Sequence, residues 1–175
     1  AARTGFDAVV LDPVMVATSG DRLLDEAAVA AVRELVPRAS IITPNLPEAM
    51  CLLGREEDVT EEEFPEVARE LWKLLGRRNA WVYLKGGHLE GESAYDLLFN
   101  NVVSVPFTAP RVPTKNTHGT GCTLSAALAA LRPRHNNWAD TVQEAKIWLS
   151  DALAKADTLE VGHGIGPVHH FHAWW

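Results

Sequence analysis

Blocks of apolar residues alternate with blocks at helical spacing along most of the chain. Three continuous apolar runs are typical of strands buried on both faces of a parallel sheet: residues 6–12, 40–43 and 80–85. Apolar side chains recur at helical spacing in residues 25–36. Pro47 and the capping-box pattern of residues 60–63 predict further helices over residues 47–53 and 60–75. Strand and helix therefore alternate, which is the pattern of an α/β fold.

Residues with strong local preferences mark where these elements begin and end. Asp25 and Asn137 are typical N-caps, and the second precedes a long amphipathic helix. Gly54 and Gly76 follow the last apolar position of a helix and predict its end. Two further apolar runs, residues 93–99 and 102–107, flank Asn100-Asn101 and predict an antiparallel hairpin at the sheet edge.

The apolar run at residues 6–12 lies very close to the start of the chain. A strand buried on both faces needs neighbours, and few other strands follow it. We therefore expect either a small domain or a longer polypeptide that begins before residue 1. A chain of 175 residues has the length of one domain with its own hydrophobic core.

Residues 116–122, with the sequence NTHGTGC, predict a glycine-flanked turn that opens a helix. Gly119 and Gly121 allow the backbone to approach a ligand, and the free amides of the first turn favour an anion there. Cys122 lies at the start of this helix, where the helix dipole favours the thiolate form. The segment is thus a candidate anion hole with a candidate base, or alternatively a helix start with a buried structural cysteine.

The helix that follows has an unusual composition. Residues 123–131 are almost entirely small and apolar, so we expect this helix to be closely packed and buried.

Charged residues stand where the predicted strands end. Asp12 ends the first apolar run, Lys85 ends the third, and Glu48 lies just beyond the second. Ligands of open α/β sheets bind at the carboxyl ends of the strands, so we expect these residues and the anion hole to share one cleft. Lys85 could neutralise a phosphate, and carboxylates suit Mg²⁺. The alternatives are an Asp12 that caps a loop, a Glu48 that favours the helix dipole and a solvated Lys85.

The composition and net charge of the chain disfavour some classes of binding partner. The chain is 47% apolar and 22% charged, as in ordinary globular proteins, and its net charge of −7 disfavours nucleic acid and anionic membranes. It contains no apolar run long enough to cross a bilayer. Two cysteines with no metal-type spacing favour a reducing, cytoplasmic setting. The histidines of residues 162–172 favour a glycine-rich packing loop over a metal site, since no regular ligand spacing accompanies them.

Six segments, in the same order, resemble the bacterial hydroxymethylpyrimidine/phosphomethylpyrimidine kinases of thiamine biosynthesis. They are residues 12–17, 19–20, 43–49, 85–88, 116–122 and 164–170. This family belongs to the ribokinase superfamily, most of whose members carry Asp where this chain has Cys122. The resemblance implies a ribokinase-like three-layer α/β/α fold with a mostly parallel sheet. It covers essentially the whole chain, and it implies a single ribokinase-like domain over residues 1–175 that corresponds to the C-terminal, nucleotide-binding portion of the family.

The resemblance also implies an activity and roles for individual residues. The activity is phosphorylation of 4-amino-5-hydroxymethyl-2-methylpyrimidine and then of its monophosphate, with ATP and Mg²⁺. The implied catalytic base is Cys122, and the implied anion hole is Gly119, Thr120, Gly121 and Cys122. Lys85, Asn45 and Thr117 are implied at the nucleotide, and Glu48 and Asp12 at the metal.

Two departures from the family pattern leave alternatives open. Thr18 stands where the family usually has Lys, and about the first third of the family's length, which recognises the pyrimidine, has no counterpart here. A pyridoxal kinase of similar motif, or a fragment that binds nucleotide without catalysis, would share the remaining features. An exposed sheet edge would favour a homodimer.

Overall fold

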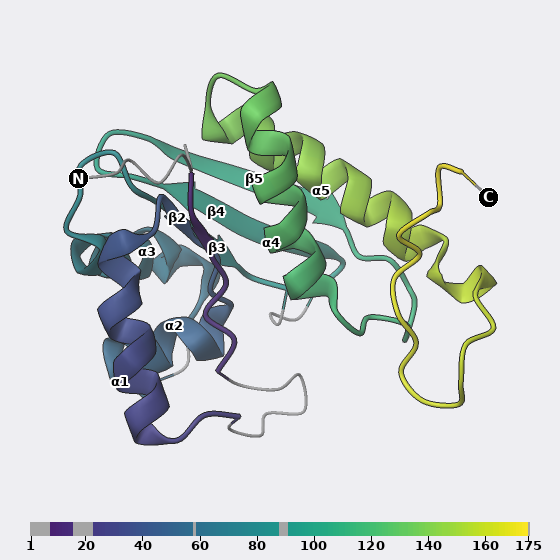
Figure 1. The fold of residues 1–175 in the computed structure, drawn as a ribbon, viewed down its shortest axis with the longest axis horizontal. Coiled ribbons are helices and arrows are strands. Elements are labelled where there is room, and N and C mark those ends of the chain that lie inside the picture. Colours follow the sequence, from purple (N-terminus) through teal and green to yellow (C-terminus); the bar gives the residue numbers. More distant parts are fainter. Residues whose placement is uncertain (1–7, 16–22, 58, 88–90, 175) are drawn as a thin grey trace, which may run out of the picture. The chain divides into compact units, whose positions relative to one another are not determined.

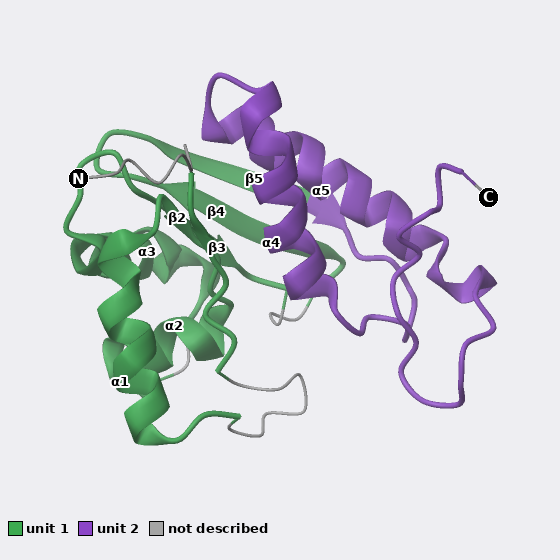
Figure 2. Cartoon of the chain, viewed as in Figure 1, with its two compact units in different colours: residues 1–108 green, residues 109–175 purple. Residues whose placement is uncertain are grey.

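The computed structural model describes residues 8–15, 23–57, 59–87 and 91–174. Its contacts divide the chain into two compact units, residues 1–108 and 109–175 (Figure 2). A single domain over residues 1–175 stays a prediction.

A five-stranded sheet runs in the order β1-β2-β3-β4-β5 (Figure 1). Its strands are β1 (Val10–Leu11), β2 (Ile41–Ile42), β3 (Trp81–Lys85), β4 (Ser93–Phe99) and β5 (Ser104–Pro110). β1 pairs with β2 and β2 with β3 in parallel, whereas β3 and β4 are antiparallel. The parallel strands bring the residues that follow them to one edge of the sheet.

β1 is shorter and less buried than its apolar pattern predicts. Val10 and Leu11 are only half-buried, and Val9 is 45% exposed. The expectation of a fully buried strand is therefore wrong in this structure. The physical reason is that β1 is an edge strand, whose only partner among the described residues is β2.

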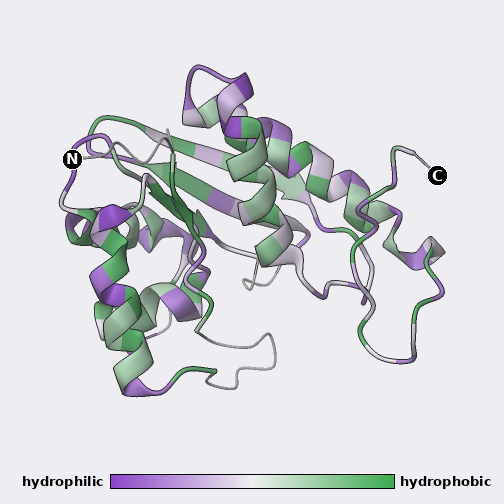
Figure 3. Cartoon of the chain, viewed as in Figure 1, coloured by the Kyte–Doolittle hydropathy of each residue, from purple (hydrophilic) through white to green (hydrophobic). Residues whose placement is uncertain are grey.

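Three α-helices and two short 3₁₀ turns accompany the sheet among the described residues of the first unit. They are α1 (Glu26–Leu35), α2 (Leu46–Leu53) and α3 (Phe64–Leu75), with η1 (Val36–Arg38) and η2 (Glu61–Glu63). Of these helices, α2 and α3 pack against the central strands of the sheet. The predicted ends at Asp25, Gly54 and Gly76 are confirmed, since these residues cap the helices. Ile42, Val82 and Leu84 form one core cluster with Phe64 and Leu71, and much of the central part of the sheet is hydrophobic (Figure 3).

The turn between β4 and β5 is longer than the two asparagines predict. The Asn100 side-chain oxygen accepts hydrogen bonds from the backbone N–H groups of Val102 and Val103, at 2.8 and 2.7 Å. Val102 and Val103 therefore belong to the turn and not to the strand, and Val102 is 86% exposed. The second strand of the hairpin begins at Ser104 rather than at residue 102.

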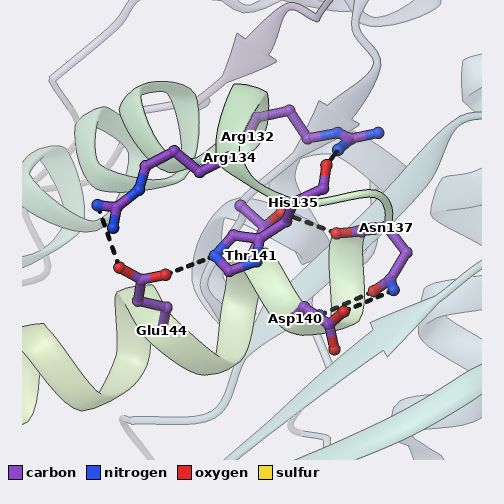
Figure 4. Close-up of polar contacts among 7 residues, drawn as sticks. All are labelled: Arg132, Arg134, His135, Asn137, Asp140, Thr141 and Glu144. Atoms are coloured by element: carbon purple, nitrogen blue, oxygen red, sulfur yellow. Dashed lines mark hydrogen bonds and ion pairs between the residues drawn. The ribbon is translucent and has the colours of Figure 1, made fainter.

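Residues 109–174 of the second unit contain two α-helices, α4 (Thr120–Leu131) and α5 (Trp138–Ala154), and the turns η3 (Arg132–Arg134) and η4 (Ala156–Thr158). Asn137 caps α5, accepting a hydrogen bond from the backbone N–H of Asp140 at 2.9 Å, as predicted (Figure 4). Glu144 of α5 faces η3 and the residue after it. Its carboxylate lies 2.5 Å from Nε2 of His135 and 3.4 Å from the guanidinium of Arg134 (Figure 4).

α4 is buried on one face only. Thr123, Leu124 and Leu128 are its buried residues, whereas Ala126, Ala129 and Ala130 are exposed. The expectation of a closely packed, buried helix is therefore wrong for the alanine face. The small apolar side chains of α4 would permit close packing on every side of the helix. Within the second unit, however, α5 packs against only one side of α4.

No helix within the described ranges combines the length and the apolar character needed to cross a lipid bilayer.

Candidate active site

Two of the charged residues at the strand ends form an ion pair. The Lys85 ammonium lies 3.2 Å from Oδ1 of Asp12, with their side chains only 14% and 10% exposed. The buried Thr43 hydroxyl donates a hydrogen bond to the same Asp12 oxygen, at 2.8 Å. Asp12, Thr43 and Lys85 follow or end the three parallel strands, so the sheet itself assembles this cluster.

The second carboxylate oxygen of Asp12 is the unusual feature of the cluster. Oδ2 is buried and has no hydrogen-bond partner among the described residues. Leaving a buried carboxylate oxygen unpaired is costly, so such an atom points to an additional ligand. A hydrated Mg²⁺ fits this oxygen, because Mg²⁺ binds through one or two carboxylates and keeps several waters.

Asn45 and Glu48 form a reciprocal cap at the start of α2. The Asn45 side-chain oxygen accepts from the Glu48 backbone N–H, and Oε2 of Glu48 accepts from the Asn45 backbone N–H, both at 2.8 Å. This is a capping box, so both side chains have a structural role in beginning the helix. The signal for this role is present in the sequence, since an Asn three residues before a Glu is itself a capping-box pattern.

Glu48 is nonetheless more than a helix cap. Its side chain lies in a buried position, with the residue 3% exposed, and this burial raises the pKa of its carboxyl above the usual value of 4.5. The charge of Lys85 and the Asn45 N–H act in the opposite direction and lower that pKa, while the charge of Asp12 raises it. Glu48 therefore belongs electrostatically to the Asp12–Lys85 cluster, and a cation there would favour its ionised form.

Asp96 is a buried acid that the sequence patterns did not single out. One of its oxygens accepts from the Tyr83 hydroxyl at 2.7 Å, and the other accepts from the backbone N–H of Gly86 at 3.0 Å. It thereby holds the turn that directly follows Lys85. The signal that could have found it is a lone carboxylate within the otherwise apolar strand β4.

The predicted anion hole has the backbone that such a site requires. Gly119 is the N-cap of α4 in the left-handed conformation, with φ 79°, which glycine adopts without strain. It has no side chain with which to cap the first-turn amides of Gly121 and Cys122. The carbonyl of Thr117 accepts from both the N–H and the hydroxyl of Thr120, at 3.3 and 2.6 Å, which ties the preceding loop to the helix start.

Cys122 lies in the first turn of α4 and is exposed. It borders a cavity of about 600 Å³ within the second unit, whose lining includes Thr123, Ala126, Ala130, Arg134 and Trp148. The alternative of a buried structural cysteine is thus wrong in this structure.

The histidine-rich segment behaves as a packing loop. His118 pairs with Pro167 in an isolated parallel bridge, and Nε2 of His170 lies 2.9 Å from the Thr123 hydroxyl. No group of three or more His, Cys, Asp or Glu side chains is arranged for a metal in the part of the chain that the structure describes.

The structure thus brings the predicted strand-end residues Asp12, Asn45, Glu48 and Lys85 together in the first unit. The residues of the predicted anion hole lie in the second unit, and both their anion-binding role and one cleft shared by the two sets stay predictions. Thr18, the neighbouring residues 19–20 and His88 lie outside the described residues.

Solved structures of known proteins share this fold. A Bacillus subtilis pyridoxal kinase in complex with ADP superposes with a TM-score of 0.82 at 32% identity, covering 95% of this chain and 61% of that one. A Staphylococcus aureus pyridoxal kinase in complex with ADP gives a TM-score of 0.83 at 28% identity, covering 96% of this chain and 60% of that one. The molecule therefore has the ribokinase-like α/β fold that the sequence predicted.

Sequence similarity defines the family. The phosphomethylpyrimidine kinase family model matches residues 1–169. The hydroxymethylpyrimidine/phosphomethylpyrimidine kinase of Escherichia coli strain K12 is 65% identical over 168 residues, or 95% of this chain and 62% of that protein. The chain belongs to the phosphomethylpyrimidine kinase family, which confirms the predicted resemblance. It spans less than two thirds of the length of these relatives.

Proposed function

We propose that this protein is a kinase that phosphorylates 4-amino-5-hydroxymethyl-2-methylpyrimidine and then its monophosphate, using ATP and Mg²⁺. The observation that carries the proposal is the strand-end cluster, in which a buried carboxylate oxygen of Asp12 lacks a partner among the described residues, next to Lys85 and Glu48. The substrate is proposed from membership of the phosphomethylpyrimidine kinase family and from 65% identity to the hydroxymethylpyrimidine/phosphomethylpyrimidine kinase of Escherichia coli.

The residues of the first unit would hold metal and nucleotide. Asp12 and Glu48 would bind Mg²⁺ through water, because each presents a carboxylate oxygen in a buried, polar position. When bound, the metal supplies charge neutralisation to the phosphates. Lys85 would act as a point cation near the nucleotide phosphates, already held in place by Asp12.

The residues of the second unit would act on the transferred phosphoryl group and the attacking hydroxyl. The first-turn amides of α4 would bind phosphoryl oxygens, since their N–H groups have no capping side chain and carry the positive end of the helix dipole. Cys122, in the same turn, would take the proton of the substrate hydroxymethyl group. Phosphoryl transfer needs little more than such positioning, charge neutralisation and a base.

A direct test measures ADP formation by the purified protein with ATP and Mg²⁺, in the presence of the hydroxymethylpyrimidine, its monophosphate or pyridoxal. We expect turnover with the pyrimidine and its monophosphate, and little with pyridoxal. Preference for pyridoxal would support the alternative of a pyridoxal kinase, which the structural similarity to pyridoxal kinases favours. ATP binding without turnover of any substrate would indicate a non-catalytic nucleotide-binding protein.

Further expectations accompany this proposal. We propose a cytoplasmic enzyme that binds neither nucleic acid nor membrane, in keeping with a net charge of −7. A homodimer stays a prediction, which sedimentation of the purified protein would check.

A further inference from the structure

The loop that leads into the anion hole is fastened by an asparagine that has no role in the proposed chemistry. Oδ1 of Asn116 accepts from the backbone N–H of Gly166 at 3.0 Å. Its side-chain amide donates to Oδ1 of Asp157 at 2.8 Å. The side chain thus bonds simultaneously to the C-terminal segment and to η4, which follow it in sequence by 50 and 41 residues.

Asp157 of η4 also binds a second residue of the loop, Thr114. The Thr114 hydroxyl donates to Oδ1 of Asp157 and accepts from the backbone N–H of Asn116, the latter at 3.0 Å. One carboxylate oxygen therefore receives hydrogen bonds from both Thr114 and Asn116. This set of residues, Thr114, Asn116, Asp157 and Gly166, is called the loop clamp below.

The C-terminal segment also holds both sides of the anion hole. Before it, the backbone N–H of His118 donates to the carbonyl of Gly166 at 3.1 Å. After it, His170 lies within hydrogen-bond distance of Thr123, the residue next to Cys122. The segment is itself anchored to α5 through the bond from the His169 N–H to the Ala152 carbonyl, at 3.0 Å.

We infer that Asn116 and Asp157 are positioning residues, which set the orientation of the first-turn amides and of Cys122 by fixing the loop clamp. This inference rests on the proposed function for its kinetic consequence, but its structural part concerns the second unit alone. Small displacements of groups that bind a transferred phosphoryl matter, since a shift of about 1 Å can reduce turnover about 100-fold.

The tight fit of Gly166 provides the first test. A Cβ at Gly166 would lie 2.4 Å from Oδ1 of Asn116, so Gly166→Ala must displace that side chain. Gly164→Ala is the matched control two residues away, because a Cβ there meets nothing within 4 Å. We expect Gly166→Ala to increase amide hydrogen exchange in residues 117–122 about 10-fold or more and Gly164→Ala to leave it unchanged.

An exchange of the two side chains tests the inferred hydrogen bond directly. Asn116→Asp places two carboxylates together and should disrupt the clamp. The double variant Asn116→Asp/Asp157→Asn restores the hydrogen bond between the two side chains, but not the one from the Thr114 hydroxyl, because an amide nitrogen at position 157 donates where the Asp157 oxygen accepted. In the full chain we expect the single variant to lower kcat/KM for ATP by roughly 10–100-fold. The double variant should recover part of this loss, together with part of the slow hydrogen exchange in residues 117–122, because one of the two hydrogen bonds to position 157 forms again.

Hydrogen exchange and calorimetric binding of ADP are measured alongside turnover, so that the clamp is tested even if the wild-type chain transfers no phosphate. Thermal unfolding identifies any variant that fails to fold. If Asn116→Asp does not fold, the comparison of hydrogen exchange between Gly166→Ala and Gly164→Ala tests the inference instead. Unchanged exchange in residues 117–122 for folded Asn116→Asp and Gly166→Ala would overturn the inference. So would a double variant that folds but recovers neither slow exchange nor ADP affinity.

Discussion

Lys85 and Asp12 lie 3.2 Å apart at the carboxyl ends of β3 and β1, although 73 residues separate them in sequence. Removing one member of a buried ion pair leaves the other charge uncompensated, which is more costly than removing both. We therefore expect Lys85→Met to lower the free energy of unfolding by roughly 3 kcal/mol. Urea denaturation measures this change.

The double variant Lys85→Met/Asp12→Asn is the control for that prediction. It removes both charges and keeps an amide oxygen at position 12 that can accept the hydrogen bond from Thr43. We therefore expect it to regain most of the lost free energy of unfolding. If Lys85→Met unfolded at the same urea concentration as the wild type, the pair would contribute nothing measurable, as is common for exposed ion pairs.

The raised pKa of Glu48 predicts how stability changes with pH. A carboxyl whose pKa rises on folding contributes its full stability below its unfolded pKa, about 4.5, and loses that contribution as pH rises through the folded value. Glu48→Gln does not titrate but keeps an oxygen that can accept from the Asn45 N–H. The stability of this variant relative to the wild type should therefore increase as pH rises above 4.5.

The same variant separates the cap from the metal site. Measured by urea denaturation in a chelator, the difference between Glu48→Gln and wild type should have the pH dependence given above. Added Mg²⁺ should then stabilise the wild type more than the variant, because the metal favours the ionised carboxylate. Equal stabilisation of both proteins by Mg²⁺ would leave Glu48 with its capping role alone.

Cys122 should be required for turnover but not for nucleotide binding. Cys122→Ala removes the proposed base and should lower kcat by about 10²–10⁴, the usual range for losing a general base. ADP affinity should stay within a few-fold of wild type, since the amides of α4 are unchanged. Cys122→Asp should keep partial activity, because a carboxylate in the first turn can also accept the proton. Turnover of Cys122→Ala within a few-fold of wild type would refute the assignment.

The parts of the fold that the sequence predicted well are those determined by local chemistry. Asp25 and Asn137 cap helices by accepting hydrogen bonds from residues three positions ahead, which the sequence alone displays. The strand-end cluster was also predictable, because parallel strands place their carboxyl ends at one edge of a sheet.

Two of the errors, at β1 and α4, concern the number of neighbours that an apolar element acquires. An apolar side chain such as that of Val9 or Ala129 can be buried without cost, but the sequence does not say that it is buried. Its exposure depends on which elements lie beside β1 and α4. Asp96 and the Asn116–Asp157 pair were missed for a related reason. Their roles exist only once β3 meets β4, or once η4 meets the loop before α4.

The turn after Lys85 has no space for a side chain, and this leads to the last prediction. A Cβ at Gly86 would lie 2.1 Å from the backbone carbonyl oxygen of Tyr95 and 2.8 Å from the ring of Phe64. Neither obstacle is the end of a flexible side chain, and the Gly86 N–H is also held by Asp96. Gly86→Ala must therefore separate β3 from β4 or move the core.

Overpacking of this kind costs about 3 kcal/mol, which corresponds to a fall of roughly 10 °C in Tm for a chain of this size. Gly87→Ala is the matched control, since a Cβ at Gly87 meets nothing within 4 Å. Thermal unfolding of the two variants side by side checks the prediction. A Gly86→Ala protein as stable as Gly87→Ala would show that the turn yields easily, and that Asp96 does not hold Lys85 in a rigid position.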